Sequence, residues 1–311
     1  MSTEHVAVAL VGPTASGKSA LAHALAFEQH DEVEILSVDA MTVYRGMDLA
    51  TAKPTRVERA EVSYHLLDLV EPSEEFTVEQ YQRAARVAAV DVWRAGHKVL
   101  YVGGTGLYGR AVLDNLAIPG QYPLVRALLE KRAHDELPAL YAELETLDPL
   151  AASRMEATNA RRIVRALEVT LGAGRPFSSY GEGLVTYGPA RVVQVALQSD
   201  FEQLDLRIAS RFHAWMDRGL LQEVVALVSA PGGLSRTARQ AVGYCELLRH
   251  IEEGADLDSC VEDAIIQSRR LARRQRSWFL RDPRVEWLDD PEKARARLLD
   301  VLNGPDGHVR D

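Results

Sequence analysis

The chain has few cysteines, few aromatic residues and no long apolar run, and each shortage excludes a class of protein. The two cysteines, Cys245 and Cys260, have a spacing that fits neither a disulfide framework nor a zinc site. Aromatic residues make up 6% of the chain, so we expect an aliphatic core. The N-terminal apolar run, 6–11, is strand-length, lacks the pattern of a signal peptide and falls far short of the ~20 residues of a membrane span. These absences predict a cytoplasmic protein that does not cross a membrane.

An excess of basic residues is also missing. The chain carries 36 basic and 45 acidic residues, which give a net charge of −9. This balance argues against a general nucleic-acid coat protein, although a local basic face can sit on an acidic body. The length of 311 residues and the apolar share of 47% suit one large domain or two unequal ones. We expect a monomer.

Apolar runs of strand length alternate with amphipathic segments. The strands that we predict are 6–11, 33–38, 64–70, 98–102, 191–197 and 285–288. The first helices are expected at 20–27 and 77–95, the second with Thr77 as its cap and Gly96 at its end. This alternation is typical of a parallel sheet with helices on both faces.

The pattern changes after residue 115. Helices are expected from 124 to 171, followed by a loop at 172–189 that is rich in Gly, Ser and Pro. Later helices are predicted at 202–218, 220–228, 238–252, 257–281 and 291–302. The fold class is therefore α/β, a parallel sheet flanked by helices, and the phosphate-binding motif described next makes this sheet P-loop NTPase-like. An all-helical domain at 118–189 would be inserted into a core domain made of residues 1–117 and 190–311.

One loop carries a phosphate-binding pattern. The sequence GPTASGKS fits G-x-x-x-x-G-K-[ST], follows a predicted strand and precedes a predicted helix. Its backbone N–H groups would converge on phosphate oxygens, Lys18 would add positive charge, and Ser19 could ligate Mg²⁺. On the motif alone the expected ligand is ATP or GTP. The loop residues are Gly12, Pro13, Thr14, Ala15, Ser16, Gly17, Lys18 and Ser19.

Two other predicted strands end in candidate site residues. In an open parallel sheet, ligands bind at the carboxyl ends of the strands. Asp39 follows one strand and suits a metal-binding acid or a general base, or else caps a turn. The segment 103–105, which ends in Thr105, is a second candidate or a plain turn.

Arginines gather on two predicted helices. Arg161, Arg162 and Arg165 share the first of them, and 269–276 contains five arginines followed by Trp278 and Phe279. Such charge runs are usually solvated faces. The alternative is an RNA-binding track in which arginines contact phosphates and aromatic rings stack on bases.

Taken together, these segments resemble one family, the tRNA dimethylallyltransferases, also called tRNA isopentenyltransferases. The likeness runs along nearly the whole chain. It rests on GPTASGKS at 12–19, SVDAMTVYRGMDLATAKP at 37–54, VGGTGLY at 102–108, RRIVRALEV at 161–169, RQAVGY at 239–244 and SRRLARRQRSWF at 268–279. The second and third of these signatures are much more specific than the phosphate loop.

The resemblance implies a reaction. A dimethylallyl group would pass from dimethylallyl diphosphate to N6 of adenosine 37, next to the anticodon of tRNA, and diphosphate would leave. The loop at 12–19 would then hold a prenyl diphosphate, with Mg²⁺ at Ser19. Asp39 would be the general base, and Lys18 and Thr105 would complete the catalytic set.

The resemblance also implies a set of tRNA contacts in the core and in the helical insertion. The expected residues are Asp39, Ala40, Met41, Thr42, Thr105, Arg126, Arg161, Arg162 and Arg165. The sequence departs from the family at two of them, because the family usually has Ser and Gln where this chain has Ala40 and Thr42. The shorter Thr42 offers a single hydroxyl for base recognition.

Two rival functions fit part of the pattern. A small-molecule kinase or ATPase explains the phosphate loop and Asp39, but neither the insertion arginines nor the 37–54 signature. A non-catalytic RNA-binding P-loop protein explains the arginines and leaves Asp39 without a role.

Overall fold

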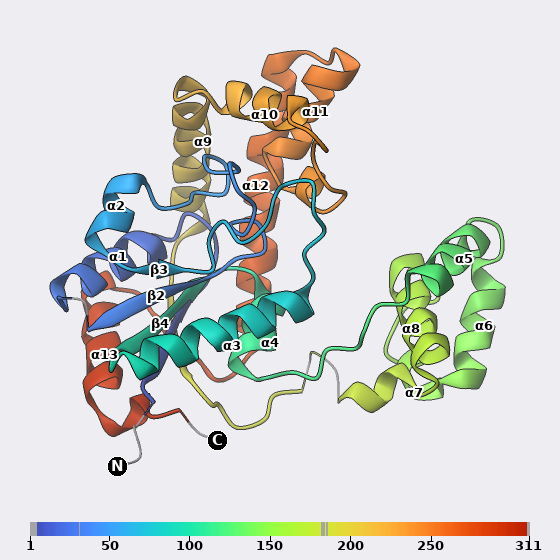
Figure 1. The fold of residues 1–311 in the computed structure, drawn as a ribbon, viewed down its shortest axis with the longest axis horizontal. Helices are drawn as coiled ribbons and strands as arrows, with labels where there is room; N and C mark the ends of the chain where they lie inside the picture. Colours follow the sequence, from blue (N-terminus) through green and yellow to red (C-terminus); the bar gives the residue numbers. More distant parts are fainter. Residues whose placement is uncertain (1–4, 31, 182–183, 185, 310–311) are drawn as a thin grey trace. The chain divides into compact units, whose positions relative to one another are not determined.

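One parallel sheet positions every candidate site residue of the core. In the computed structural model, which describes residues 5–30, 32–181, 184 and 186–309, the strand order is β3-β2-β4-β1-β5-β6. Figure 1 labels β3, β2 and β4 of this sheet. Every pair of neighbouring strands is parallel. The strands are β1 Ala7–Val11, β2 Val33–Val38, β3 Tyr64–His65, β4 Lys98–Gly103, β5 Val193–Leu197 and β6 Val285–Leu288.

The chain divides into two compact units, and the sheet belongs to the larger one. That unit comprises Met1–Asp114 and Pro189–Asp311, and the smaller one comprises Asn115–Gly188. The helices of the larger unit are α1 Lys18–Glu28, α2 Arg56–Glu61, α3 Val78–Arg94, α4 Gly106–Leu113, α9 Phe201–Asp217, α10 Leu220–Ser229, α11 Tyr244–Glu253, α12 Leu257–Leu280 and α13 Pro291–Asn303.

Both faces of the sheet are buried, because successive side chains of a strand point to opposite sides. Val8 and Leu10 of β1 pack with apolar side chains of α1 and α13. Ala7, Ala9 and Val11 join a larger core with side chains of α3, α9 and α12. This two-sided burial explains the continuous apolar runs, and the predicted α/β class with a P-loop-like parallel sheet is confirmed.

The smaller unit is helical and has its own core. Its helices are α5 Pro123–Ala133, α6 Leu137–Leu147, α7 Pro149–Ala152 and α8 Ala160–Ala173. Leu129, Leu140 and Leu167 are at most 1% exposed at its centre. Asp148 caps α7 by accepting the N–H of Ala151, and it also accepts the N–H and hydroxyl of Ser178.

The predicted strand 64–70 was too long. Only Tyr64–His65 pairs with β2, because Leu66 and Asp68 adopt positive φ angles of 66° and 55° that interrupt an extended strand. Asp68 turns its carboxylate toward Lys53 and Arg59 instead.

The predicted helix 238–252 is interrupted near its start. A short 3-10 turn, Ala238–Gln240, is followed by Gly243 at a φ of 93°, and α11 begins only at Tyr244. The cap of α3 is as expected, since Thr77 forms a capping box with Gln80. No helix in the described part of the chain is long and apolar enough to cross a membrane.

Candidate functional site

The loop 12–19 lies between β1 and α1 with its backbone amides at the start of the helix. Gly12 and Gly17 adopt φ angles of 133° and 94°, which L-residues with side chains rarely reach. Gly17 caps α1 and has no side chain to satisfy the N–H groups of the first turn. A helix N-terminus with unsatisfied N–H groups attracts anions through its amides and its dipole.

Lys18 places a cation beside this loop. Its Nζ donates to the carbonyl of Pro13 over 3.1 Å. The pKa of Lys18 is lowered to about 8, mainly by burial and also by the positive charge of Arg211, while the negative charge of Asp39 acts in the opposite direction. A half-buried lysine beside another cation, with one backbone acceptor, is suited to receive an anion.

Two arginines of α9 reach the same loop and were not singled out by the sequence. Arg211 donates to the hydroxyl of Thr14 over 2.7 Å, and Arg207 donates to the carbonyl of Ala15 over 3.3 Å. The guanidinium of Arg211 also lies over the ring of Trp215, 4.7 Å from its centroid. Burial lowers the pKa of Arg211 to about 10. The spacing of four residues, which puts both arginines on one helical face, was the signal available in the sequence.

The Arg-rich helix α12 contributes a glutamine to the loop. The side-chain oxygen of Gln275 accepts the N–H of Thr14 over 2.8 Å. Gly104 lies so close that an added Cβ would approach the Gln275 amide to 2.7 Å. The loop, the end of β4 and α12 therefore meet at one point.

The contacts of other α12 side chains bear on the alternative that residues 269–276 form an RNA-binding track. Arg273 is held by both oxygens of Asp205, at 3.1 and 2.8 Å. The alternative in which aromatic rings stack on bases does not fit Phe279, which is 4% exposed within the core, whereas Trp278 is partly buried and packs against that core. Arg274 is the arginine of this run that lines the cavity described below.

Asp39 and Thr105 come together from the ends of β2 and β4. One carboxylate oxygen of Asp39 accepts the N–H of Met41 over 2.8 Å, and the other accepts the hydroxyl of Thr105 over 3.4 Å. The N–H of Ala40 donates to the Thr105 hydroxyl oxygen over 3.3 Å. Gly103 allows this approach, since an added Cβ would lie 1.9 Å from the carbonyl oxygen of Val38. Asp39 caps its own turn and also faces a cavity.

A single cavity of about 690 Å³ unites these groups. Its lining includes Thr14, Ala15, Gly17, Lys18, Ser19, Asp39, Ala40, Met41, Thr42, Thr105, Arg207, Arg211, Arg274 and Gln275. Beside it, Ser16 Oγ and Arg211 Nε are buried without a hydrogen-bond partner among the residues described. Both could donate to an oxygen-rich anion. For Mg²⁺, the exposed hydroxyl of Ser19 and the carboxylate of Asp39 supply oxygen ligands of the kind that this ion prefers.

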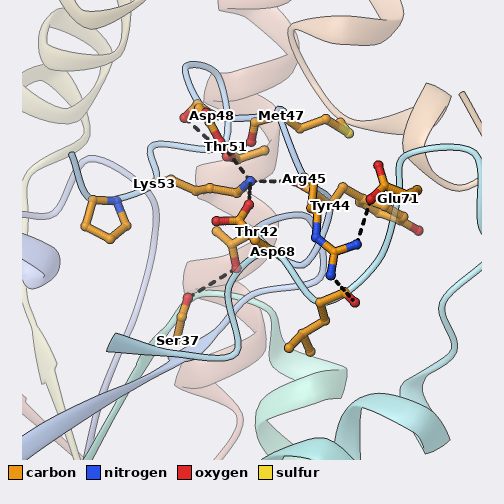
Figure 2. A network of polar contacts seen from close by, with 12 residues as sticks. Ser37, Thr42, Tyr44, Arg45, Met47, Asp48, Thr51, Lys53, Asp68 and Glu71 are labelled. Atoms are coloured by element: carbon orange, nitrogen blue, oxygen red, sulfur yellow. Dashed lines mark hydrogen bonds and ion pairs between the residues drawn. The ribbon is translucent and has the colours of Figure 1, made fainter. Parts of the chain in front are cut away.

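The segment 42–54 is anchored by a buried lysine (Figure 2). The side chain of Lys53 is 1% exposed, and its Nζ donates to Tyr44 O, Asp48 Oδ1 and Asp68 Oδ1 at 2.5, 2.9 and 2.6 Å. Thr42, which lies at the start of this segment, is 5% exposed and places its hydroxyl 3.2 Å from that of Ser37. The residue expected to read a base is therefore largely engaged within the protein.

The four arginines of the smaller unit that were expected to contact tRNA divide into two groups. Arg161 and Arg162 are exposed in the first turn of α8. Arg165 and Arg126 are both paired with the buried carboxylate of Glu168, at 3.0 and 3.5 Å. The first pair is accessible to a phosphate backbone, whereas the second helps to hold α5 against α8.

The sheet, its flanking helices and the loop between β1 and α1 define an α/β protein with a P-loop-like fold. The model of the IPP transferase family matches residues 42–282. The chain belongs to the IPP transferase family. This membership decides against the small-molecule kinase and against the non-catalytic RNA-binding protein.

Individual relatives cover nearly the whole chain. A tRNA dimethylallyltransferase of Thermobifida fusca is 45% identical over 285 residues, which are 90% of this chain and 89% of that protein. Its counterpart in Bifidobacterium animalis subsp. lactis is 42% identical over 285 residues, 90% of this chain and 81% of that protein.

Solved structures agree with the fold. The full-length tRNA isopentenylpyrophosphate transferase of Bacillus halodurans is 31% identical with a TM-score of 0.68, covering 96% of this chain and 97% of that one. A eukaryotic dimethylallyltransferase acting on tRNA has a TM-score of 0.79 at 24% identity, with 99% of this chain and 81% of that one covered. The second likeness concerns the fold alone.

Proposed function

We propose that this enzyme transfers the dimethylallyl group of dimethylallyl diphosphate to N6 of adenosine 37 in tRNA. The family makes the reaction class a prenyl transfer to tRNA, and the observation that carries the finer proposal is the cavity. It brings an anion-binding loop with Lys18 to the same space as the Asp39 carboxylate. One end suits a diphosphate and the other suits an amine that must lose a proton.

The leaving group needs compensation for its growing negative charge. In our proposal the loop amides, Lys18, Arg207 and Arg211 surround the diphosphate, where preorganised donors and cations stabilise a developing charge. Ser19 and the diphosphate oxygens would hold Mg²⁺, which supplies further positive charge when bound. Within the described part of the chain, Arg211 Nε and Ser16 Oγ have no hydrogen-bond partner, so both would be further donors.

The exocyclic amine of adenine is a weak nucleophile, because its lone pair is delocalised into the ring. Its electron pair forms the new N–C bond to the allylic carbon while the C–O bond breaks and its electrons leave with diphosphate. The proton of N6 passes to the Asp39 carboxylate, a general-base step. Thr105 orients that carboxylate through its 3.4 Å hydrogen bond.

The acceptor must expose its base. In our proposal adenosine 37 leaves the anticodon-loop stack to enter the cavity, at a cost of a few kcal/mol. Ala40, Met41 and Thr42 lie beside Asp39 on this route. The exposed Arg161 and Arg162 would contact phosphates of the anticodon stem. The whole enzyme would act as a monomer in the cytoplasm.

The decisive test incubates the purified protein with Mg²⁺, dimethylallyl diphosphate and an unmodified anticodon stem-loop with adenosines at positions 36 to 38. The RNA is then digested and its nucleosides are weighed. A gain of one dimethylallyl group on adenosine is the expected result, and a stem-loop with guanosine at position 37 is the matched control. Bound but unmodified RNA would contradict the donor or the acceptor that we propose.

A further inference from the structure

The turn that carries Asp39 is held at Ser37, the residue two positions before it, by one hydroxyl group from α3 and one from the end of the same stretch. Tyr81 of α3 donates its hydroxyl to the backbone carbonyl of Ser37. The Ser37 hydroxyl lies 3.2 Å from that of Thr42, as Figure 2 shows. The hydroxyl contact thus joins the two ends of the stretch 37–42, and Tyr81 ties the Ser37 end to α3, with Asp39 between the two ends.

Tyr81 is placed rigidly for this contact. It is fully buried and directly follows Gln80, the last residue of the capping box that begins α3. Its ring meets that of Tyr108 edge-on, with centroids 4.8 Å apart, and Tyr108 belongs to α4, the helix that Thr105 caps. Tyr81 therefore lies between the strand end that carries Asp39 and the helix start that carries Thr105.

The hydroxyl of Tyr81 is also electrostatically close to Asp39. Burial raises the pKa of Tyr81 well above its ordinary value, and the negative charge of Asp39 adds to the rise. The phenol therefore stays protonated and can act only as a donor to Ser37 in this place. Without it, the Ser37 carbonyl would lose its side-chain donor inside the core, and the turn would relax to find another.

We propose that Tyr81 is a positioning residue for the reaction, whose hydroxyl holds Ser37 so that the turn keeps Asp39 at the acceptor amine. This inference rests on the proposed function. A general base works only within hydrogen-bond reach of the proton that it removes, and a displacement of about 1 Å can cost about 10²-fold in rate. Thr42 takes part in the same arrangement through its hydroxyl.

The first test replaces Tyr81 with Phe, which keeps the ring and removes only the hydroxyl. We expect kcat for transfer to the stem-loop to fall about tenfold, as for a base displaced by less than 1 Å. KM for dimethylallyl diphosphate and for RNA should stay within about twofold of wild type. The matched control is Tyr101→Phe, because Tyr101 lies in the same core at 6% exposure but on β4 and outside the cavity lining. Equal kcat values for the two variants would overturn the proposal.

The second test asks whether Tyr81 acts through Asp39. In an Asp39→Asn background, measured in single turnovers, the change Tyr81→Phe should cost nothing further, because the group that it positions is gone. A loss in this background equal to that in the wild type would reduce Tyr81 to a structural role and overturn the inference. Melting temperatures of both Phe variants identify any loss that comes from folding. If the wild-type protein transfers no prenyl group, the proposed function itself fails, which is a different result from an active wild type with an unaffected Tyr81→Phe variant.

Discussion

The hydroxyl of Thr105 donates to the carboxylate of Asp39 over 3.4 Å, although the two residues are 66 positions apart. The contact exists because β2 and β4 are neighbours in register, with Val38 opposite Gly103. The next residues of both strands therefore emerge at the same edge of the sheet. This edge is where open parallel sheets bind ligands, and here the loop of β1 lies beside it.

The position of Asp39 gives the first prediction. Asp39→Ala should retain affinity for dimethylallyl diphosphate but lose at least ~10²-fold in turnover, the usual scale for a general base. Calorimetry measures the first quantity and nucleoside mass spectrometry the second. Thr105→Val, which only removes the group that orients the carboxylate, should lose less. Near wild-type turnover in Asp39→Ala would remove Asp39 from the mechanism.

The pKa of Lys18 predicts how diphosphate binding depends on pH. Since this pKa is lowered to about 8, Lys18 is mostly protonated below pH 8 and mostly neutral above it. The affinity for inorganic diphosphate, taken relative to a Lys18→Met variant so that the titration of the ligand itself cancels, should therefore be level between pH 6.5 and 7.5 and fall by up to about tenfold per pH unit above 8. Binding above pH 8 should also take up a proton, which calorimetry in two buffers of different ionisation enthalpy detects.

A matched pair of variants tests that assignment. Lys18→Met should bind diphosphate more weakly and lose the fall above pH 8. Lys98→Met changes a lysine at the start of β4 that donates to Asn303 and does not line the cavity, so it should keep both affinity and slope. A Lys18→Met variant with the wild-type pH profile would assign the titration to another group.

The sequence predicts many of the site residues at this edge of the sheet, because the motifs and apolar runs that identify them are local. The loop 12–19 and the apolar runs of β1, β2 and β4 place Lys18, Asp39 and Thr105 at the ends of neighbouring strands. Arg211 and Gln275 escaped prediction because they reach Thr14 from helices about 200 and 260 positions away. Nothing local distinguishes such side chains from the solvated charges and amides on the same helices.

The irregular segment after β2 shows another limit of predicting the structure from the sequence. Apolar residues at 64–70 predicted a strand, but the positive φ of Asp68 serves its contacts with Lys53 and Arg59. Trp278 and Phe279 were open to a base-stacking interpretation because the sequence alone does not distinguish an RNA-binding aromatic pair after arginines from the aromatic pair of a core helix. In each case a long-range contact, rather than a local preference, decided the structure.

The smaller unit gives a prediction about RNA binding. Replacing both Arg161 and Arg162 by Ala should weaken the stem-loop complex. The slope of the logarithm of the binding constant against the logarithm of the salt concentration should fall in magnitude by about 1 to 2, because two phosphate contacts release about that number of counterions. Filter binding between low and moderate salt measures this slope. Arg132→Ala is the control, because Arg132 is paired with Glu136 and Glu143 and should leave the slope unchanged. An unchanged slope in the double variant would place the phosphate contacts elsewhere.

Lys53 is predicted to stabilise the fold more than it serves the chemistry. Lys53→Met keeps the length of the side chain but leaves Tyr44 O, Asp48 and Asp68 without their shared donor. Breaking a buried ion pair by removing one partner costs about 3–5 kcal/mol, and since Asp48 is 55% and Asp68 28% exposed, we expect the lower end of this range. Urea unfolding measures the change. Lys293→Met, which removes an exposed pair with Asp289, should cost less than ~1 kcal/mol. If both variants unfolded at the same urea concentration, the buried network could not be what holds the segment 42–54.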